Sequence, residues 1–172
     1  MRDAVRITLR DYCEADIDAI HQLLNNYDVS RFLSSRIPFP YTREDAVWWV
    51  NTGSQNEITR VIEFNQQLAG IIGVARGPHE NYRCGELGYW LGEPFWGRGL
   101  ATLAVSRMTE MIFNETDIVR LFAPIYDCNK ASMRVVEKCG YKLEGVAKTS
   151  IFKDGRFYDE HIYARLKADI KP

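Results

Sequence analysis

The chain has 172 residues, of which 46% are hydrophobic and 26% charged, values typical of one ordinary globular domain with an apolar core. Its 22 Lys and Arg residues nearly balance 23 Asp and Glu residues, for a formal net charge of -1. No stretch concentrates the basic residues on one helix face, which disfavours direct binding of DNA or RNA. A protein partner that itself sits on RNA remains open.

Sequence features also bear on where the protein works. No apolar run approaches the roughly 20 residues that a membrane span needs. Residues 1–10 carry charge at Arg2, Asp3, Arg6 and Arg10, where a signal peptide would be apolar. The four cysteines form no CxxC pair, so we expect reduced thiols. These features predict a cytoplasmic protein with no membrane partner, and they leave both a monomer and a homodimer open.

No repeat, low-complexity tract or linker interrupts the sequence, so we expect a single domain over residues 1–172. Alternating apolar residues predict a first strand at 5–9. The next elements are an amphipathic helix, an irregular segment rich in aromatic residues and Pro, and a second helix. The first helix is indicated by apolar residues at helical spacing, Ile17, Ile20, Leu23 and Leu24. The irregular segment covers 30–41, and a capping box of Thr42 and Asp45 opens the second helix.

The rest of the chain alternates between strands and helices. Strands are expected at 58–64, 68–74, 86–91, 119–125, 141–146 and 157–166, with turns at Asn65-Gln66 and Asp154-Gly155. One helix follows a Gly-rich loop at 92–99, and its apolar stripe is Leu100, Leu103, Ala104, Met108, Met111 and Ile112. Another helix spans 129–139 and stops at Gly140. This order predicts an α/β fold with a mixed sheet.

The strongest local signal is the glycine loop between a strand and a helix, Gly97-Arg98-Gly99. The first N–H groups of a helix lack partners and carry partial positive charge. Glycines let that backbone approach an anion closely. The loop therefore predicts a pyrophosphate cradle, and the alternative is a turn whose glycines only permit close packing.

Three other anion or metal motifs are disfavoured. A dinucleotide-binding motif would need Gly or Ala at position 102, where Thr102 stands, and no P-loop motif is present. The three histidines are His21, His79 and His161, and none has the spacing of a metal-dependent hydrolase. We expect no metal, and we interpret His21 as a surface residue of a helix.

The segment 96–101 resembles the acetyl-CoA loop of GNAT acetyltransferases, with Trp96 where Gln or Arg is usual. That departure is similar to the RimJ/RimL-like branch, as are the blocks at 129–145 and 38–46. The resemblance implies a GNAT fold, a mixed and mostly antiparallel sheet of about seven strands with four helices. It also implies transfer of an acetyl group from acetyl-CoA, a co-substrate, to a primary amine.

The resemblance further implies how acetyl-CoA is held. Amides of 98–102 would bind the pyrophosphate, and the strand edge at 90–92 would bind the pantetheine where that strand splays from its neighbour. Arg98, Lys130 and Arg134 are phosphate candidates, or solvated helix charges. The implied cofactor-binding residues are Trp90, Leu91, Gly92, Gly97, Arg98, Gly99, Leu100, Ala101, Thr102, Asn129, Ser132 and Arg134.

Two residues are candidates for the proton transfers that the reaction needs. An alkyl amine must lose a proton before it attacks, and Glu86 on the strand before the loop is our candidate base. The alternative is a structural carboxylate. Many GNAT enzymes have a Tyr acid at the position of Val136, so the resemblance assigns the acid role to Ser132 instead. That hydroxyl could equally cap the helix.

The acceptor stays open between a protein N-terminus, an amino acid, a polyamine and an aminoglycoside-like compound. Residues 31–49, rich in aromatic side chains, are expected to shape its site. The ribosomal enzyme of the branch is thought to use a Glu where Ile151 stands here, which weakens the case for a ribosomal protein. A rival interpretation is a non-catalytic module that binds acyl-CoA for regulation.

Overall fold

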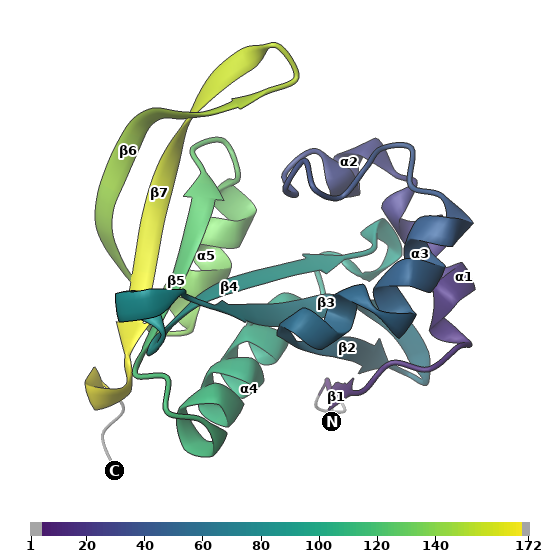
Figure 1. Cartoon of the computed structure of the whole chain (residues 1–172), viewed down its shortest axis with the longest axis horizontal. Helices are drawn as coiled ribbons and strands as arrows, with labels where there is room; N and C mark the ends of the chain where they lie inside the picture. The colour runs from purple at the N-terminus through teal and green to yellow at the C-terminus, as the bar shows by residue number, and fades with distance from the viewer. Residues whose placement is uncertain (1–4, 170–172) are drawn as a thin grey trace. The chain divides into compact units, whose positions relative to one another are not determined.

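The computed structural model describes residues 5–169. Its strands form one seven-stranded sheet in the order β1-β2-β3-β4-β5-β7-β6 (Figure 1). β4 and β5 are parallel, whereas β1–β2, β5–β7 and β6–β7 are antiparallel. The strands are β1 Thr8–Arg10, β2 Ile58–Phe64, β3 Gln67–Arg76, β4 Cys84–Leu91, β5 Arg120–Tyr126, β6 Lys142–Lys153 and β7 Arg156–Leu166.

Among the described residues there are five α-helices, four of which have nine residues or more. They are α1 Asp16–Leu24, α2 Tyr27–Ser30, α3 Arg43–Asn51, α4 Leu100–Glu115 and α5 Lys130–Lys138. The predicted α/β class, the mixed and mostly antiparallel sheet of seven strands and the four main helices are confirmed. The short α2 was not predicted, because four residues carry too little periodicity to be recognised.

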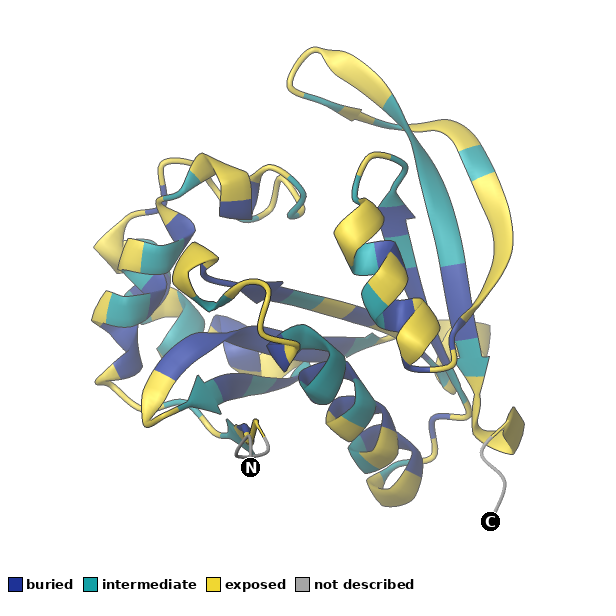
Figure 2. Cartoon of the chain, turned by 180° about the vertical axis from the view of Figure 1, so that it is seen from behind, coloured by how far each residue is buried: buried dark blue, intermediate teal, exposed yellow. Residues whose placement is uncertain are grey.

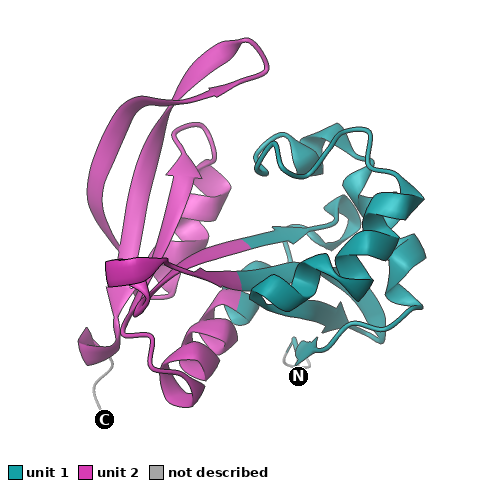
Figure 3. Ribbon diagram, viewed as in Figure 1, with its two compact units in different colours: residues 1–73, 89–104 teal, residues 74–88, 105–172 magenta. Residues whose placement is uncertain are grey.

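The chain divides into two compact units (Figure 3). Unit 1 comprises residues 1–73 and 89–104, and unit 2 comprises residues 74–88 and 105–172. β3, β4 and α4 each contribute residues to both units. The expectation of a single domain over residues 1–172 stays a prediction.

In unit 1, helices α1 and α3 bury their apolar sides with β2, β3 and the end of β4. The core residues are Ile17, Ile20, Leu24, Val29, Tyr41, Ala46, Val61, Leu68, Ile71 and Trp90. The predicted capping box begins α3, because the Thr42 hydroxyl accepts from the Asp45 N–H at 3.1 Å and the Asp45 carboxylate accepts from the Thr42 N–H at 2.8 Å. The capping box therefore fixes where this helix enters the core.

In unit 2, α5 packs on one face of β5 and β7. Tyr163 Oη donates to Glu137 of α5 at 2.9 Å, and the Arg165 guanidinium donates to the Cys139 carbonyl at 2.7 Å. Thr109 of α4 and Tyr141 share a buried hydroxyl hydrogen bond of 2.8 Å. The odd-numbered residues 163 and 165 of β7 thus face the helix, and the residues between them face the other way. The tip of the β6–β7 hairpin is largely exposed (Figure 2).

Two predicted strands differ most from their bounds in the structure, and the others agree to within two residues at each end. The first was predicted at 5–9 but is Thr8–Arg10, whose three residues pair with 61–63 of β2. The strand predicted at 141–146 continues to Lys153, with register shifts between Leu143 and Gly145 and between Ala147 and Ile151. Those irregularities break the two-residue alternation by which a strand is recognised.

Gly70 of β3 is required by the close approach of β4. A Cβ atom at this position would lie 2.0 Å from the Trp90 carbonyl oxygen, a backbone atom that cannot turn away. We expect Gly70→Ala to destabilise the fold by about 1–3 kcal/mol or more, the usual cost of overpacking. Thermal and urea unfolding measure this, with Gly145→Ala as control because a Cβ there meets open space. Unchanged stability of Gly70→Ala would contradict the strand geometry.

Candidate functional site

The glycine loop joins β4 to α4 through the 3₁₀ turn Glu93–Phe95. Gly97 and Gly99 have φ angles of 73° and 76°, a region that L side chains rarely adopt. A Cβ at either position would meet no atom within 4 Å. These glycines therefore serve the backbone conformation, and the alternative that they permit close packing is wrong.

Helix α4 begins at Leu100, directly after this loop. The Leu103 N–H donates to the Gly99 carbonyl at 3.2 Å. The preceding N–H groups lie at the positive end of a helix of 16 residues. Trp96, Gly97, Arg98 and Gly99 are all exposed. An open loop with left-handed glycines at a helix start is suited to binding a phosphate group.

Arg98 is an exposed cation in this loop. Its guanidinium carbon lies 5.8 Å from the centroid of the Phe64 ring, within reach of a cation–π interaction. The second predicted phosphate ligand, Arg134, is exposed on α5 in unit 2. Both side chains can meet an anion from solvent, and their assignment to phosphate stays a prediction.

Some backbone groups of residues 90–92 make hydrogen bonds within unit 1. The Gly92 N–H donates to the Ala69 carbonyl of β3 at 2.8 Å, and the Gly92 carbonyl accepts from the Phe95 N–H at 3.0 Å. Strand alternation turns the Leu91 N–H and carbonyl to the opposite edge from those of Gly92. The Leu91 carbonyl accepts from Trp96 Nε1 at 2.8 Å. Leu91 therefore presents its N–H to the outer edge.

Trp96 has a role that the sequence did not reveal. Its position looked like a departure from the usual Gln or Arg, yet its indole fastens the loop to the end of β4 through the Leu91 carbonyl. No sequence signal indicates such a bond, because an exposed Trp before glycines has many possible partners.

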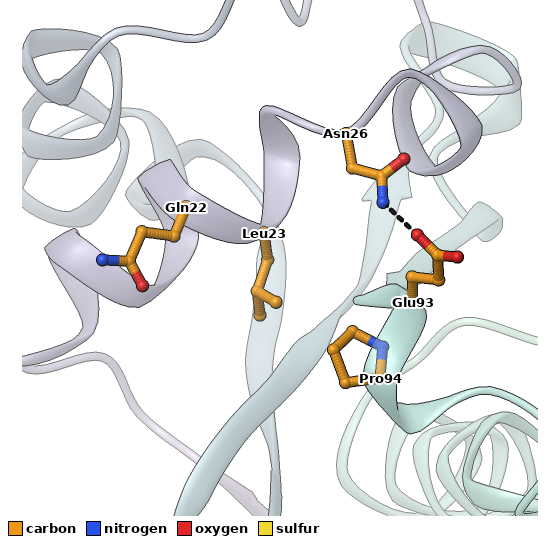
Figure 4. Close-up of a pocket in the computed structure, with 5 residues that line it drawn as sticks. All are labelled: Gln22, Leu23, Asn26, Glu93 and Pro94. Carbon is orange, nitrogen blue, oxygen red and sulfur yellow. Dashed lines mark hydrogen bonds between the residues drawn. The ribbon is translucent and has the colours of Figure 1, made fainter.

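A pocket of about 500 Å³ lies beside the 3₁₀ turn in unit 1 (Figure 4). It is lined by Gln22 and Leu23 of α1, Asn26 and the turn residues Glu93 and Pro94. The Asn26 amide donates to the Glu93 carboxylate, and that bond ties the start of α2 to the turn. None of the residues 31–49, predicted to shape the acceptor site, lines this pocket.

The start of α5 in unit 2 carries Asn129 and Ser132. Asn129 is the N-cap, and its side-chain oxygen accepts from the Ser132 N–H at 3.2 Å. Ser132 is the third residue of the helix and is half-buried. Asn129 therefore fills the cap position, and the role of the Ser132 hydroxyl stays a prediction. Val136, the position at which the resemblance predicts a Tyr in many GNAT enzymes, is fully buried in the core.

Glu86 is exposed on β4, at the last registered pair with the parallel neighbour β5. The pairs are Cys84–Arg120, Gly85–Leu121 and Glu86–Phe122. Within the described part of unit 2, the following residues Leu87 and Gly88 have no registered partner on β5, although β5 continues to Tyr126. The divergence agrees with the splay that the resemblance implies. It leaves Glu86 where the two strands begin to part.

Among residues 5–169, no group of three or more His, Cys, Asp or Glu side chains is arranged to hold a metal ion. The helices of the same residues include none that is long and apolar enough to cross a membrane. All four cysteines are free thiols.

The mixed sheet, its diverging parallel pair and the glycine loop at the start of α4 together define an α/β protein with a loop suited to binding phosphate groups. Residues 6–142 match the family described as acetyltransferase (GNAT) domain. The chain belongs to the GNAT acetyltransferase family. The match runs through both compact units and includes the loop.

Similar proteins span nearly the whole chain. The uncharacterized N-acetyltransferase p20 of Bacillus licheniformis is 25% identical over 170 residues, 95% of this chain and 94% of that protein. The spermidine N(1)-acetyltransferase of Escherichia coli (strain K12) is 23% identical and covers 91% of this chain and 84% of its own length. RimL, a ribosomal L7/L12 alpha-N-protein acetyltransferase solved with coenzyme A, aligns with a TM-score of 0.81 at 23% identity, over 95% of each chain. The RimJ/RimL-like resemblance is consistent with these matches.

Proposed function

We propose that this chain is an N-acetyltransferase that moves the acetyl group of acetyl-CoA onto a primary amine by direct attack, and that residues 1–172 act as one GNAT domain. The observation that carries the proposal is the exposed glycine loop, with positive φ at Gly97 and Gly99, at the start of α4. Membership of the GNAT family and the coenzyme A bound to RimL support it.

Acetyl-CoA would bind through backbone and side-chain groups. Amides from Arg98 to Thr102 would hold the pyrophosphate, because helix-start N–H groups favour anions. The Leu91 N–H, on the outer edge of β4, would donate to the pantetheine in the manner of an added strand. Asn129 still has an amide nitrogen to donate after its oxygen has capped α5. Arg98 and Arg134 would meet the phosphates.

The reaction would form one C–N bond and break one C–S bond. Glu86 would take a proton from the acceptor ammonium, directly or through water, so that the neutral amine attacks the acetyl carbonyl. Backbone N–H groups would stabilise the oxyanion as it develops. The C–S bond would then break, the Ser132 hydroxyl would donate its proton to the departing thiolate, and the second proton of the attacking nitrogen would return to the Ser132 oxygen through water. The products are an acetamide and coenzyme A.

The acceptor would be a small amine or a protein N-terminus. A spermidine acetyltransferase and an L7/L12 acetyltransferase are both among the similar proteins. Ile151, where the ribosomal enzyme is thought to have a Glu, makes a ribosomal protein the weaker option. The four cysteines are free thiols, as is usual in a reducing compartment. We therefore propose that the protein works in the cytoplasm.

Acetyl-CoA should stabilise the folded chain. At about 100 times its dissociation constant, a ligand adds roughly 2.7 kcal/mol, which raises the melting temperature of a domain of this size by about 5–10 °C. Differential scanning fluorimetry measures the shift. NADH, which offers a pyrophosphate but no pantetheine, should shift the melting temperature much less. No shift with acetyl-CoA would overturn the proposal.

A thiol-release assay with acetyl-CoA and a panel of amines separates an enzyme from the rival regulatory module. An enzyme releases coenzyme A in proportion to the acceptor consumed. Stabilisation by acetyl-CoA without release from any amine would favour a non-catalytic acyl-CoA-binding module.

A further inference from the structure

The sheet of unit 2 has one face that α5 does not cover. Side chains of β4, β5 and β7 point to this same face. Glu86 lies beside Phe122 in the parallel pair. Phe122 is opposite Ala164, and Tyr126 is opposite Glu160, in the antiparallel pair. Tyr163 and Arg165 point toward α5, so Ala164 and Glu160 point away from it. Glu86, Tyr126 and Glu160 therefore share the face opposite α5.

Glu160 is one of three half-buried carboxylates in the described part of unit 2. Of the other two, Asp159 is paired with Lys148, and Asp127 has a buried Oδ1 without a hydrogen bond. Glu160 lies on β7, a strand flanked by β5 and β6. Within residues 5–169 no hydrogen bond or ion pair engages its carboxylate. Burial raises its pKa. A half-buried carboxylate without a cationic partner is costly in the absence of a ligand, and such groups are frequent at functional sites.

Aromatic side chains stand next to this carboxylate. The Tyr126 and Tyr158 rings meet edge to face with centroids 5.2 Å apart. The Arg156 guanidinium lies 4.3 Å from the Tyr158 centroid. One ring of this aromatic pair therefore already packs against a cation, which belongs to the protein. Tyr126 remains beside Glu160, and burial together with the Glu160 charge raises the pKa of its phenol. A carboxylate beside an aromatic ring is a favourable setting for an organic ammonium.

Glu160 is too far from Glu86 to share its proton. Glu86 pairs with Phe122 and Glu160 with Tyr126, and the offset of four positions along β5 corresponds to about 13 Å along the strand. That offset exceeds the roughly 4–6 Å over which charges shift one another's pKa strongly. The two carboxylates are therefore separate subsites on one face.

We propose that Glu160, with Tyr126, binds a second positive charge of the acceptor, so that the substrate is a small diamine or polyamine rather than a monoamine. The proposal rests on the proposed acetyl transfer, with Glu86 acting on the reacting amine. Glu160 sets specificity for the distal ammonium and takes no part in the chemical step.

The matched acceptors 1,6-diaminohexane and hexylamine test this, because they differ in the distal ammonium. In steady-state thiol release with acetyl-CoA, the wild type should prefer the diamine about 10–100-fold in kcat/KM, the range expected for a charged hydrogen bond. Glu160→Gln should abolish the preference by raising KM for the diamine, with kcat and hexylamine kinetics unchanged. Glu110→Gln removes the same charge from an exposed site on α4 and should keep the preference.

Three results would overturn the proposal: equal use of the two amines by the wild type, an intact preference in Glu160→Gln, or an equal fall in kcat for both amines. The melting temperature of Glu160→Gln should hold or rise, since an unpaired half-buried charge is lost.

A binding arm separates this proposal from the proposed function. In an NMR titration, 1,6-diaminohexane should shift the amides of Tyr126 and Ala147, the residues opposite Glu160, and the shifts should disappear in Glu160→Gln. If no amine is acetylated but these shifts appear and depend on Glu160, the acetyl-transfer proposal fails and the ammonium subsite stands. If acetylation occurs without such shifts, the subsite is wrong and the acetyl transfer stands.

Discussion

Replacing Glu86 with Gln should lower turnover about 10²–10⁴-fold near neutral pH, the usual contribution of a general base, while acetyl-CoA affinity stays close to that of the wild type. The side chain is exposed on β4 where the register with β5 ends. An exposed carboxylate on the face opposite α5 can meet an acceptor from solvent. Gln keeps the size of the side chain and removes its ability to take a proton.

The pH profile distinguishes a base from a structural carboxylate. Alkyl amines with a pKa near 10 are mostly protonated at pH 7 and become neutral as pH rises. The deficit of Glu86→Gln should therefore shrink toward high pH, because less proton removal is needed. Turnover from pH 6 to 9, with Glu110→Gln as the charge-matched control, makes the comparison. Wild-type turnover of Glu86→Gln across that range would show that Glu86 is structural and that the base lies elsewhere.

Features set by a few neighbouring residues were predictable from the sequence. Asn65 and Gln66 have φ angles of 49° and 62°, and Asp154 and Gly155 have 50° and 78°, as tight hairpin turns require. Gly140 has a φ of 80° and follows α5, as a helix stop does. Each signal acts over two to four residues, so no tertiary information was needed.

Features that depend on distant residues were not predictable. Trp96 finds the Leu91 carbonyl only because the 3₁₀ turn folds back onto β4. Tyr126 and Glu160 are 34 positions apart in the sequence and meet only through the β5–β7 register. The glycine loop was recognised from its motif, but the partners of Gly92 follow from the pairing of β3 with β4. The sequence therefore predicted which residues belong to the candidate site. It did not predict which residues they contact, because those contacts form only in the fold.

Ser132→Ala should lower turnover at least about 10²-fold if the hydroxyl protonates the departing coenzyme A thiolate. Val136 cannot supply a proton, and Asn129 already caps α5 through its own side chain. Removing the hydroxyl therefore leaves the helix cap intact, and Ala suits a helix interior. The melting temperature and acetyl-CoA affinity of the variant should stay near those of the wild type.

Three measurements on this variant separate the possible roles of Ser132. A fall in turnover at saturating acetyl-CoA with unchanged affinity indicates a proton donor, because the lost interaction exists only in the transition state. Weaker acetyl-CoA binding with normal turnover at saturation means that Ser132 positions the co-substrate and nothing more. Ser106→Ala makes the same change on α4 and should leave all three quantities unchanged. Retained turnover and affinity in Ser132→Ala would mean that water protonates the thiolate and that the acid assignment is wrong.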